Sequence, residues 1–323
     1  MVMLTSIGQR GDAATLEQIG FAGYLHKPVR QNQLYDCLEL IVGRDIESGD
    51  YVSSNPPQGI ITKHIIAESV RKGVRILLVE DNIINQKVAQ HMLKSLGYRV
   101  DVAADGQEAV RALEMINYDL ILMDCLMPVM NGFEATAAIR DASPEQFNNK
   151  IPIIAMTANA TQDDRQKCLS SGMNDYLSKP IKKELLAELI EKWLEYSSVQ
   201  PVEISAQTGA TPEPELFNEG DMLESMDNDS EFMRSILGDA IESLPDELET
   251  LRSLLEGNDA VAIRGQAHTM KGVAANIYAP SLRETCLRIE TAAKGGDIET
   301  AREILPDLEL IFSLTIEKIR SKY

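Results

Sequence analysis

Between residues 74 and 196, short apolar runs alternate with stretches in which apolar residues recur every three or four positions. A short apolar run bounded by turn residues predicts a buried strand, and the wider spacing predicts an amphipathic helix. The predicted strands are residues 74–79, 99–103, 120–123, 151–156 and 175–177. The predicted helices are residues 84–96, 106–115, 132–141, 163–171 and 182–194. This alternation predicts an α/β domain with a five-stranded parallel sheet and helices on both of its faces.

From residue 216 onward the strand pattern disappears and only helical periodicity remains. The predicted helices are residues 231–256, 259–277, 281–293 and 299–319, preceded by a short helix near 222–226. The turns between them are short and contain Gly, Asn and Pro, which predicts an antiparallel, all-α four-helix bundle. Pro245 and Pro306 fall inside two of these helices, where they are expected to cause kinks.

The first 44 residues repeat part of the α/β segment. When the sequence is shifted along itself, Thr5 falls on Thr157 and Lys27 falls on Lys179 without a gap. Residue 1 then corresponds to residue 153, so this copy lacks any counterpart of residues 74–152, including Asp124. We therefore expect residues 1–44 to be the C-terminal remnant of a second α/β domain, marginally stable and chemically inert.

Two stretches have the composition of linkers. Residues 45–73 contain Asn55-Pro56-Pro57, which cannot continue a helix or a central strand, and leave room for a short helix near 65–71. Residues 197–215 hold three prolines among Thr, Ser, Gln and Glu, which is typical of a flexible tether. The predicted organisation is therefore a remnant at 1–44, a linker at 45–73, an α/β domain at 74–196, a tether at 197–215 and a helical domain at 216–323.

Composition narrows the possible functions. The net charge of −19 argues against direct binding to nucleic acid or to an anionic membrane. The four cysteines are far apart, which favours a reducing compartment, and Cys125 is expected to be a packing residue with no redox role. No apolar run approaches the length of a membrane span, and the N-terminus does not resemble a signal peptide. We expect a cytoplasmic chain.

Polar side chains follow four of the five predicted strands of the α/β domain. Glu80 and Asp81 follow the first strand, Asp124 the third, Thr157 the fourth and Lys179 the fifth. Parallel strands bring these positions to one edge of the sheet. Three carboxylates together repel one another unless a cation holds them, and hard oxygen ligands suit Mg²⁺. An ammonium and a hydroxyl beside them provide what is needed to bind a phosphoryl group that a carboxylate accepts.

One predicted helix of the bundle carries a polar stripe beside its apolar one. His268, Lys271 and Gly272 are offset by one residue from the core-facing positions, and so by about 100° around the helix. His268 is therefore expected to be exposed, with an ammonium one turn away. A neutral imidazole nitrogen is a nucleophile, and the ammonium would stabilise a phosphoryl group that it receives. Taken alone, an exposed histidine is usually only a surface residue.

Four sequence motifs in residues 74–194 resemble the receiver (response-regulator) domain of two-component signalling, which has a flavodoxin-like fold. The motifs are Glu80-Asp81-Asn82, Asp124 with Met127-Pro128-Val129-Met130-Asn131-Gly132, Met156-Thr157-Ala158 and Ser178-Lys179-Pro180. The resemblance implies that Asp124 is the phosphoacceptor. It also implies an Mg²⁺ site formed by Glu80, Asp81, Asp124 and the carbonyl of Leu126.

The same resemblance assigns further roles. Thr157 and Lys179 would bind the phosphoryl oxygens, and Thr157 and Tyr176 would form the conformational switch. Asn85-Gln86 resembles the receivers found inside hybrid histidine kinases. Asn85, Gln86, Pro180 and, in the bundle, Gly272 would serve in docking.

The sequence Ala267-His268-Thr269-Met270-Lys271-Gly272 resembles the His-x-x-Lys-Gly signature of histidine phosphotransfer domains, over roughly the last hundred residues. This resemblance implies that His268 carries a phosphoryl group with Lys271 beside it. Tyr278 departs from the pattern, since many members have Gly there.

Together the two resemblances predict a phosphorelay protein that passes a phosphoryl group between Asp124 and His268. They imply that it is the C-terminal part of a hybrid sensor histidine kinase, a parent protein that can be anchored in the inner membrane. The implied partners are a histidine kinase and a downstream response regulator. No ATP-binding motif is evident, so the chain is expected to transfer phosphoryl groups without making them from ATP. The alternative is a non-catalytic docking or scaffold module of a signalling complex.

Overall fold

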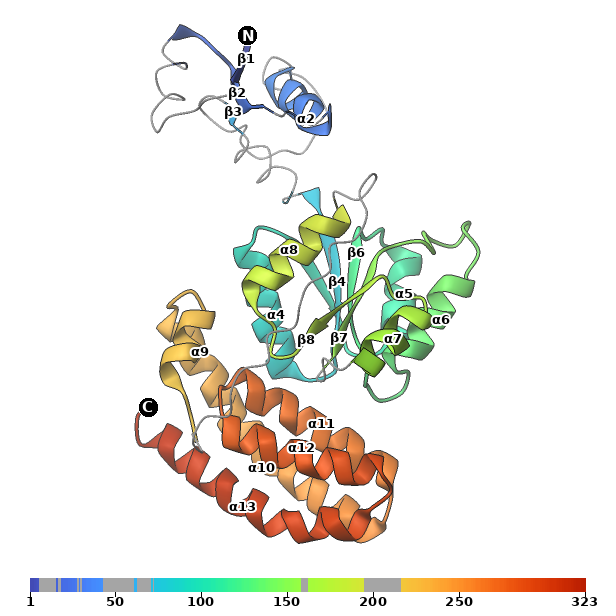
Figure 1. The fold of residues 1–323 in the computed structure, drawn as a ribbon, viewed down its shortest axis with the longest axis vertical. Helices are drawn as coiled ribbons and strands as arrows, with labels where there is room; N and C mark the ends of the chain where they lie inside the picture. The colour runs from blue at the N-terminus through green and yellow to red at the C-terminus, as the bar shows by residue number, and fades with distance from the viewer. Residues whose placement is uncertain are drawn as a thin grey trace. The chain divides into compact units, whose positions relative to one another are not determined.

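The computed structural model describes residues 74–157, 162–194 and 216–323 continuously, and residues 1–5, 16, 19–27, 29, 31–42, 61–62, 71 and 73 of the N-terminal part (Figure 1). By their contacts, the residues form two compact units. One unit is Met1–Val74 with Gly97–Arg99, and the other is Arg75–Leu96 with Val100–Tyr323. The predicted tether at 197–215 lies outside the described residues, as does most of the helix expected near 65–71.

The N-terminal unit contains a three-stranded parallel sheet in the order β1-β2-β3. Its described elements are β1 (Val2–Thr5), β2 (Gly23–His26), β3 (Ile61–Thr62) and α2 (Gln31–Val42). Ile61 is completely buried and packs with Leu25 and Cys37. Sequence reasoning treated residues 45–73 only as a linker and missed β3, because a two-residue strand gives no periodic signal. This strand pairs with β2, so the small sheet gains a third strand and additional core.

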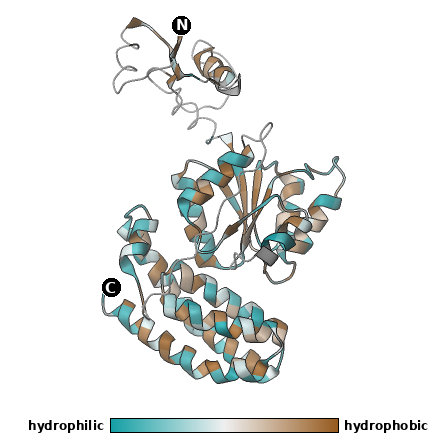
Figure 2. Ribbon diagram, viewed as in Figure 1, coloured by the Kyte–Doolittle hydropathy of each residue, from teal (hydrophilic) through white to brown (hydrophobic). Residues whose placement is uncertain are grey.

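The second unit contains the expected five-stranded sheet, and its strands lie in the order β5-β4-β6-β7-β8 (Figure 1). Its strands are β4 (Arg75–Val79), β5 (Arg99–Ala103), β6 (Leu120–Asp124), β7 (Ile153–Thr157) and β8 (Asp175–Ser178). The pairs β4–β6, β6–β7 and β7–β8 are parallel. Every residue of β6 and β7 is buried, and these strands are among the brown, apolar elements of Figure 2.

Two strand boundaries differ from the sequence-based expectation in ways that concern the polar edge. Asp124 and Thr157 are the last residues of β6 and β7, not the first residues beyond them. β7 begins at Ile153, two residues later than expected, because Pro152 has no N–H to contribute to the sheet. Both functional candidates are therefore held by strand hydrogen bonding, as shown by the pairing of Asp124 with Met156.

In the described part of this domain, five helices follow the strands, and side chains cap the N-termini of α4 and α6. The helices of this domain are α4 (Ile83–Ser95), α5 (Gly106–Met115), α6 (Gly132–Asp141), α7 (Gln162–Ser170) and α8 (Lys183–Leu194). Asn82 caps α4, and its Oδ1 accepts hydrogen bonds from the N–H groups of Ile84 and Asn85 at 2.9 and 3.2 Å. Asn131 and Glu134 form a capping box at the start of α6. α4 thus begins directly after Glu80 and Asp81, whereas α6 begins after a loop that follows Asp124 and contains Leu126.

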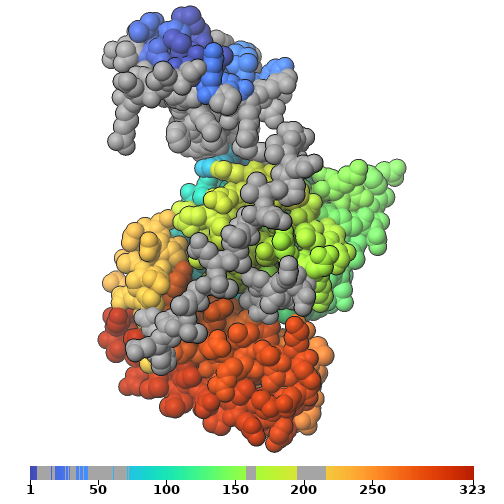
Figure 3. All heavy atoms as spheres, viewed as in Figure 1, coloured from blue at the N-terminus to red at the C-terminus, as the bar shows by residue number. Residues whose placement is uncertain are grey.

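The C-terminal part is a helical bundle, coloured orange to red in the space-filling view (Figure 3). Its helices are α9 (Glu219–Ser225), α10 (Ser230–Gly257), α11 (Ala260–Asn276), α12 (Pro280–Lys294) and α13 (Ile298–Arg320). α10 and α13 continue through Pro245 and Pro306. Asn258 and Tyr278 have positive φ angles of 61° and 52° in the turns around α11. The position of Tyr278 is thus one that glycine fills with less strain. Among the described helices, none is both long and apolar enough to cross a membrane.

Gly132 is a position at which the fold tolerates no side chain. A Cβ atom built there would lie 2.0 Å from the backbone oxygen of Asp124. We predict that Gly132→Ala lowers the free energy of unfolding of the α/β domain by about 1–3 kcal/mol, since the backbone carrying Asp124 must move. Trp193 is the only tryptophan and lies in α8, so its fluorescence follows this domain in urea unfolding.

The control for this prediction is Gly238→Ala, which makes the same chemical change inside α10. A Cβ at Gly238 meets no atom within 4 Å. This variant should leave the Trp193 transition unchanged and strengthen α10 slightly, since Ala is the better helix former. An unchanged Trp193 transition in Gly132→Ala would contradict the steric argument.

Candidate functional site

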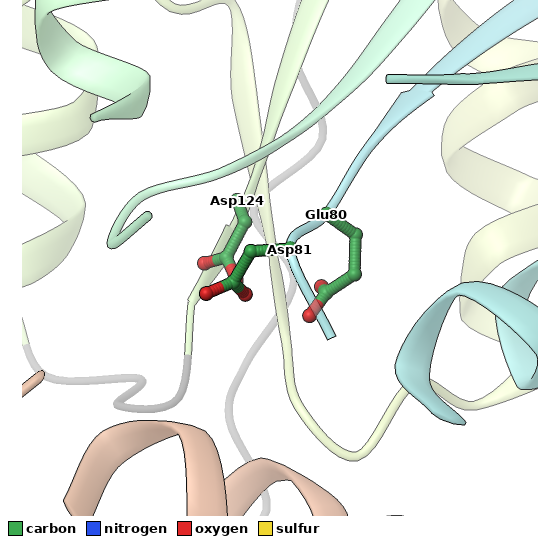
Figure 4. A group of neighbouring side chains, drawn as sticks. All are labelled: Glu80, Asp81 and Asp124. Carbon is green, nitrogen blue, oxygen red and sulfur yellow. The ribbon is translucent and has the colours of Figure 1, made fainter. Parts of the chain in front are cut away.

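Three carboxylates meet at the carboxyl edge of the five-stranded sheet (Figure 4). Glu80 and Asp81 follow β4, Asp124 ends β6, and one oxygen of each lies within 4.8 Å of the others. Glu80 and Asp124 are buried, and Asp81 is half-buried. Asp81 and Asp124 are the two that point most directly toward each other in the close-up (Figure 4). The structure thus brings together the acidic residues that the sequence pattern predicted.

Lys179 supplies the nearest positive charge. Its Nζ lies 2.6 Å from Oε2 of Glu80 and 2.5 Å from Oδ2 of Asp124. Its backbone N–H donates to the carbonyl of Thr157 at 2.7 Å, and the following peptide bond to Pro180 is cis. Burial opposes the charged form, but the two carboxylates outweigh that effect and raise the pKa of Lys179. The ammonium therefore stays charged in a buried position.

One lysine does not neutralise this much buried negative charge. Burial, with the nearby charge of Asp124, raises the pKa of Glu80 to about 8 despite the opposing effect of Lys179. Burial followed by the charge of Asp124 also raises the pKa of Asp81. A divalent cation would remove this excess of negative charge, and carboxylate oxygens are the ligands that Mg²⁺ prefers. The donor set therefore fits the metal that the sequence implies.

Three further predicted residues lie around the carboxylates. Thr157 is buried at the end of β7, and Ala158 after it lies outside the described residues. The backbone N–H of Leu126 donates to Oδ1 of Asp124 at 3.2 Å, so this loop folds back over the acidic side chain. Tyr176 on β8 is half-buried, with the guanidinium carbon of Arg165 5.6 Å from the centre of its ring.

His268 and Lys271 lie on α11 as expected, but they are not exposed. His268 is 7% exposed and Lys271 only 2%. The expectation of exposure was wrong because Glu290 on α12 reaches this face. Its Oε1 lies 2.9 Å from Nδ1 of His268, and its Oε2 accepts a hydrogen bond from Nζ of Lys271. Sequence reasoning missed Glu290 altogether.

Glu290 orients the imidazole. Burial alone would raise the pKa of Glu290, but the hydrogen bonds and charges of His268 and Lys271 outweigh it and hold that pKa at about 2. Burial lowers the pKa of Lys271, and Glu290 offsets part of the effect. Because a carboxylate only accepts hydrogen bonds, Nδ1 of His268 must carry a proton. In the neutral imidazole Nε2 then carries the lone pair, and Nε2 is buried with no hydrogen-bond partner among the described residues.

A sequence signal for Glu290 does exist. On α12 it lies four residues after Cys286 and three before Ala293, both of which are buried. A lone carboxylate on the apolar stripe of a helix must have a buried partner. Only the fold shows that this partner is the His268–Lys271 pair, because α12 packs against α11.

The α/β domain and the bundle meet along α4, which contacts both α10 and α11. Nζ of Lys87 lies 2.6 Å from Oδ2 of Asp239, and the rings of His91 and Phe232 stack with centroids 3.9 Å apart. The charge of His268 also contributes to the pKa of Asp81, so the imidazole lies within electrostatic range of the acidic cluster. The two candidate reactive sites therefore face the same interface.

Two of the four predicted docking residues meet at this interface. A Cβ on Gly272 would lie 3.0 Å from Nδ2 of Asn85, so the missing side chain makes room for Asn85. Gln86 instead points back into its own domain, where its Nε2 donates to the carbonyl of Glu80 at 2.7 Å. Pro180 follows Lys179 at the sheet edge.

A cavity of about 520 Å³ opens beside the acidic cluster. Both domains line it, with Asp81, Asn82, Ile83 and Ile84 on one side and Asp239, Glu242, Ser243, Glu247 and Thr269 on the other. Nδ2 of Asn82 donates to Oε1 of Glu247 at 3.2 Å, and burial raises the pKa of Glu247 to about 7. The cavity gives water and small ions a route to Asp81.

Cys125 packs against Cys168, with the two sulfur atoms 3.8 Å apart and both thiols free. The hydrogen bond to Cys168 and burial raise the pKa of Cys125. A protonated, buried thiol is unreactive, in agreement with the predicted packing role.

Comparison with known proteins agrees with this geometry. The response regulator receiver domain matches residues 76–191, and the Hpt domain matches residues 235–320. The chain therefore joins a receiver domain to a histidine phosphotransfer (Hpt) domain, the parts of a two-component phosphorelay. Its relatives are hybrid sensor histidine kinases.

Among those relatives, sensor histidine kinase GacS of Pseudomonas protegens is 31% identical over 69% of this chain and 24% of its own length. Hybrid signal transduction histidine kinase B of Dictyostelium discoideum is 48% identical over 42% of this chain and 7% of its own length. The chain thus spans at most about a quarter of these two relatives. The receiver domain of sensor histidine kinase PA1611 from Pseudomonas aeruginosa, solved with magnesium in its active site cleft, is 53% identical over 38% of this chain and 98% of its own, with a TM-score of 0.35.

The buried Glu290 carboxylate predicts a pH-dependent stability of the bundle. Its pKa of about 2 in the folded chain lies below the value of about 4.3 for an exposed glutamate. The stabilisation is therefore complete above pH of about 4.3 and is lost as the pH falls through about 2, and it amounts to on the order of 3 kcal/mol. Glu290→Gln should lower the free energy of unfolding by roughly that amount at pH 7, with the difference from wild type shrinking as the pH approaches 2.

Urea unfolding followed by far-ultraviolet circular dichroism at a series of pH values measures this difference. Glu317→Gln makes the same charge change at an exposed position of α13 and serves as the control, with no pH-dependent difference expected. A Glu290→Gln difference that stays constant from pH 7 to pH 2 would show that the carboxylate is not held ionised.

Proposed function

We propose that this chain passes a phosphoryl group between Asp124 of the receiver and His268 of the Hpt domain. The observation that carries the proposal is the shared interface. The acidic cluster and His268 face each other where α4 contacts α10 and α11, and Nε2 of His268 is buried there without a partner among the described residues. An acceptor carboxylate and a nucleophilic nitrogen thus occupy the same desolvated region.

In the receiver, Asp124 accepts the phosphoryl group on a carboxylate oxygen. Lys179, which now contacts Oδ2 of Asp124, is positioned to bind an oxygen of the phosphoryl group when it arrives. The hydroxyl of Thr157 donates to another, and Tyr176 responds as the switch residue. Glu80, Asp81, Asp124 and the carbonyl of Leu126 would hold a magnesium ion, which supplies positive charge to offset that of the phosphoryl oxygens.

In the transfer step, the lone pair of His268 Nε2 attacks the phosphorus of the Asp124 phosphate. A nitrogen–phosphorus bond forms, and the bond between phosphorus and the Asp124 oxygen breaks, with the electron pair returning to the carboxylate. The Nδ1 proton stays in place, and Glu290 balances the positive charge that the imidazole acquires. Lys271 is held close to the same imidazole by Glu290.

The wider relay follows from the same chemistry. We infer that a histidine kinase and a separate response regulator are the donor and acceptor outside this chain, with magnesium as the cofactor. Either direction of flow uses the same two groups, because the transfer step is reversible.

Two complementary variants test the transfer. With labelled acetyl phosphate, Asp124→Asn should take up no phosphate on the receiver, and His268→Gln should form aspartyl phosphate but no phosphohistidine. The two variants mixed should form phosphohistidine, because the labelled Asp124 of one chain can meet the His268 of the other. Hydroxylamine cleaves the acyl phosphate, whereas phosphohistidine survives alkali, so the two products are distinguished on the same gel.

His26→Gln is the matched control, since it removes a histidine on β2 of the N-terminal unit and should label as the wild type does. Alkali-stable label in His268→Gln alone would refute the assignment of His268. A wild-type chain that forms aspartyl phosphate but never phosphohistidine would favour the docking-module alternative.

A further inference from the structure

Three side chains form a hydrogen-bonded chain that crosses from the receiver to the Hpt domain. Nδ2 of Asn85 donates to Oε1 of Glu80 at 2.6 Å, and Nδ2 of Asn276 donates to Oδ1 of Asn85 at 2.6 Å. Glu80 and Asn85 are buried in the receiver, and Asn276 is the last residue of α11. A residue of the Hpt domain is therefore two hydrogen bonds away from a carboxylate of the proposed metal site.

The donor and the acceptor of each of these hydrogen bonds follow from the chemical groups that take part. In the ionised form that would bind a metal, Glu80 presents only acceptor oxygens, and its other oxygen is already bound by Lys179 at 2.6 Å. Asn85 must therefore turn its NH₂ group toward Glu80, which leaves its carbonyl facing the Hpt domain. Only a donor can satisfy that carbonyl, and Asn276 provides one.

The Hpt domain also confines Asn85 sterically. The position of the missing Cβ of Gly272 lies 3.0 Å from Nδ2 of Asn85, so the amide packs against the backbone of α11. Two independent contacts, one polar and one steric, thus hold the Asn85 amide in a single orientation while the domains are in contact. Without the Hpt domain, its carbonyl would be left to water.

We propose that Asn85 and Asn276 are positioning residues that couple Hpt docking to magnesium binding in the receiver. Docking fixes the Asn85 amide, the amide fixes the carboxylate of Glu80, and the receiver then binds magnesium more tightly. Because coupling between two binding events is reciprocal, magnesium strengthens docking by the same factor. The inference rests on the proposed function, which supplies the metal site and the docked pair.

The coupling depends on the two hydrogen bonds that link Asn276, Asn85 and Glu80. The Lys87–Asp239 ion pair lies in the same interface, but its side chains are 42% and 31% exposed and do not contact the acidic cluster in the described contacts. A partly exposed pair of this kind contributes little to the interface, so weakening it leaves the domains in contact and does not change what Asn85 presents to Glu80. It therefore offers a control at the same interface.

Magnesium titration of the full chain by calorimetry tests the proposal. Asn85→Leu should weaken magnesium binding about tenfold, as expected for loss of an outer partner of a ligand. Asn276→Leu, a substitution in the other domain, should weaken it by about three- to tenfold. The double variant should be no weaker than Asn85→Leu alone, because both substitutions break the same chain.

Asp239→Asn should change magnesium affinity by less than about twofold. Trp193 fluorescence confirms that the receiver of each variant is folded. The proposal is overturned if Asn276→Leu leaves magnesium affinity unchanged, if its effect adds in full to that of Asn85→Leu, or if Asp239→Asn weakens binding as much. These outcomes concern metal binding alone, so normal phosphohistidine formation in the wild type would leave the proposed function standing.

Discussion

Two buried carboxylates that share one lysine are the constraint on which the receiver depends. Glu80 and Asp124 are both buried and both contact Nζ of Lys179 at the end of the sheet. Burying carboxylates costs several kcal/mol each unless charge and hydrogen bonds offset it, and one ammonium offsets only part of the total. Added positive charge would therefore stabilise the site. The ends of β4, β6 and β8 bring these groups together, so the positive charge is required at one point.

The Hpt site differs from the receiver site in that its buried negative charge is already balanced. Glu290 is a single buried carboxylate between Lys271 and His268, so its charge is already balanced by the ammonium when the imidazole is neutral. The imidazole can then gain positive charge on phosphorylation beside a carboxylate that is still ionised. The receiver site carries an excess of negative charge. The Hpt site holds the ionised Glu290, which can balance the positive charge that a phosphoryl group would create on His268. The two halves are complementary in charge as well as in chemistry.

Much of this arrangement follows from the sequence, because it depends on local periodicity. The strands of the receiver and the helices of the bundle have strong repeating patterns, and the parallel topology brings Glu80, Asp124 and Lys179 together. The sequence did not reveal β3, Glu290 or Asn276, for a common physical reason. Each acts through a partner on another element, and no local pattern records which side chain a buried carboxylate or amide will meet. The error over the exposure of His268 has the same origin, since α12 and the receiver cover that face.

The burial of His268 has a consequence for the relay. With α4 of the receiver against α10 and α11, the imidazole is 7% exposed, so a separate regulator cannot reach Nε2 in this arrangement. Onward transfer requires the receiver to leave the Hpt face. The contacts that hold it there, such as the Lys87–Asp239 ion pair and the His91–Phe232 stack, are partly exposed and individually weak. An interface of this kind can favour internal transfer while still releasing His268, so in the proposed relay the same face would serve both this receiver and a separate one.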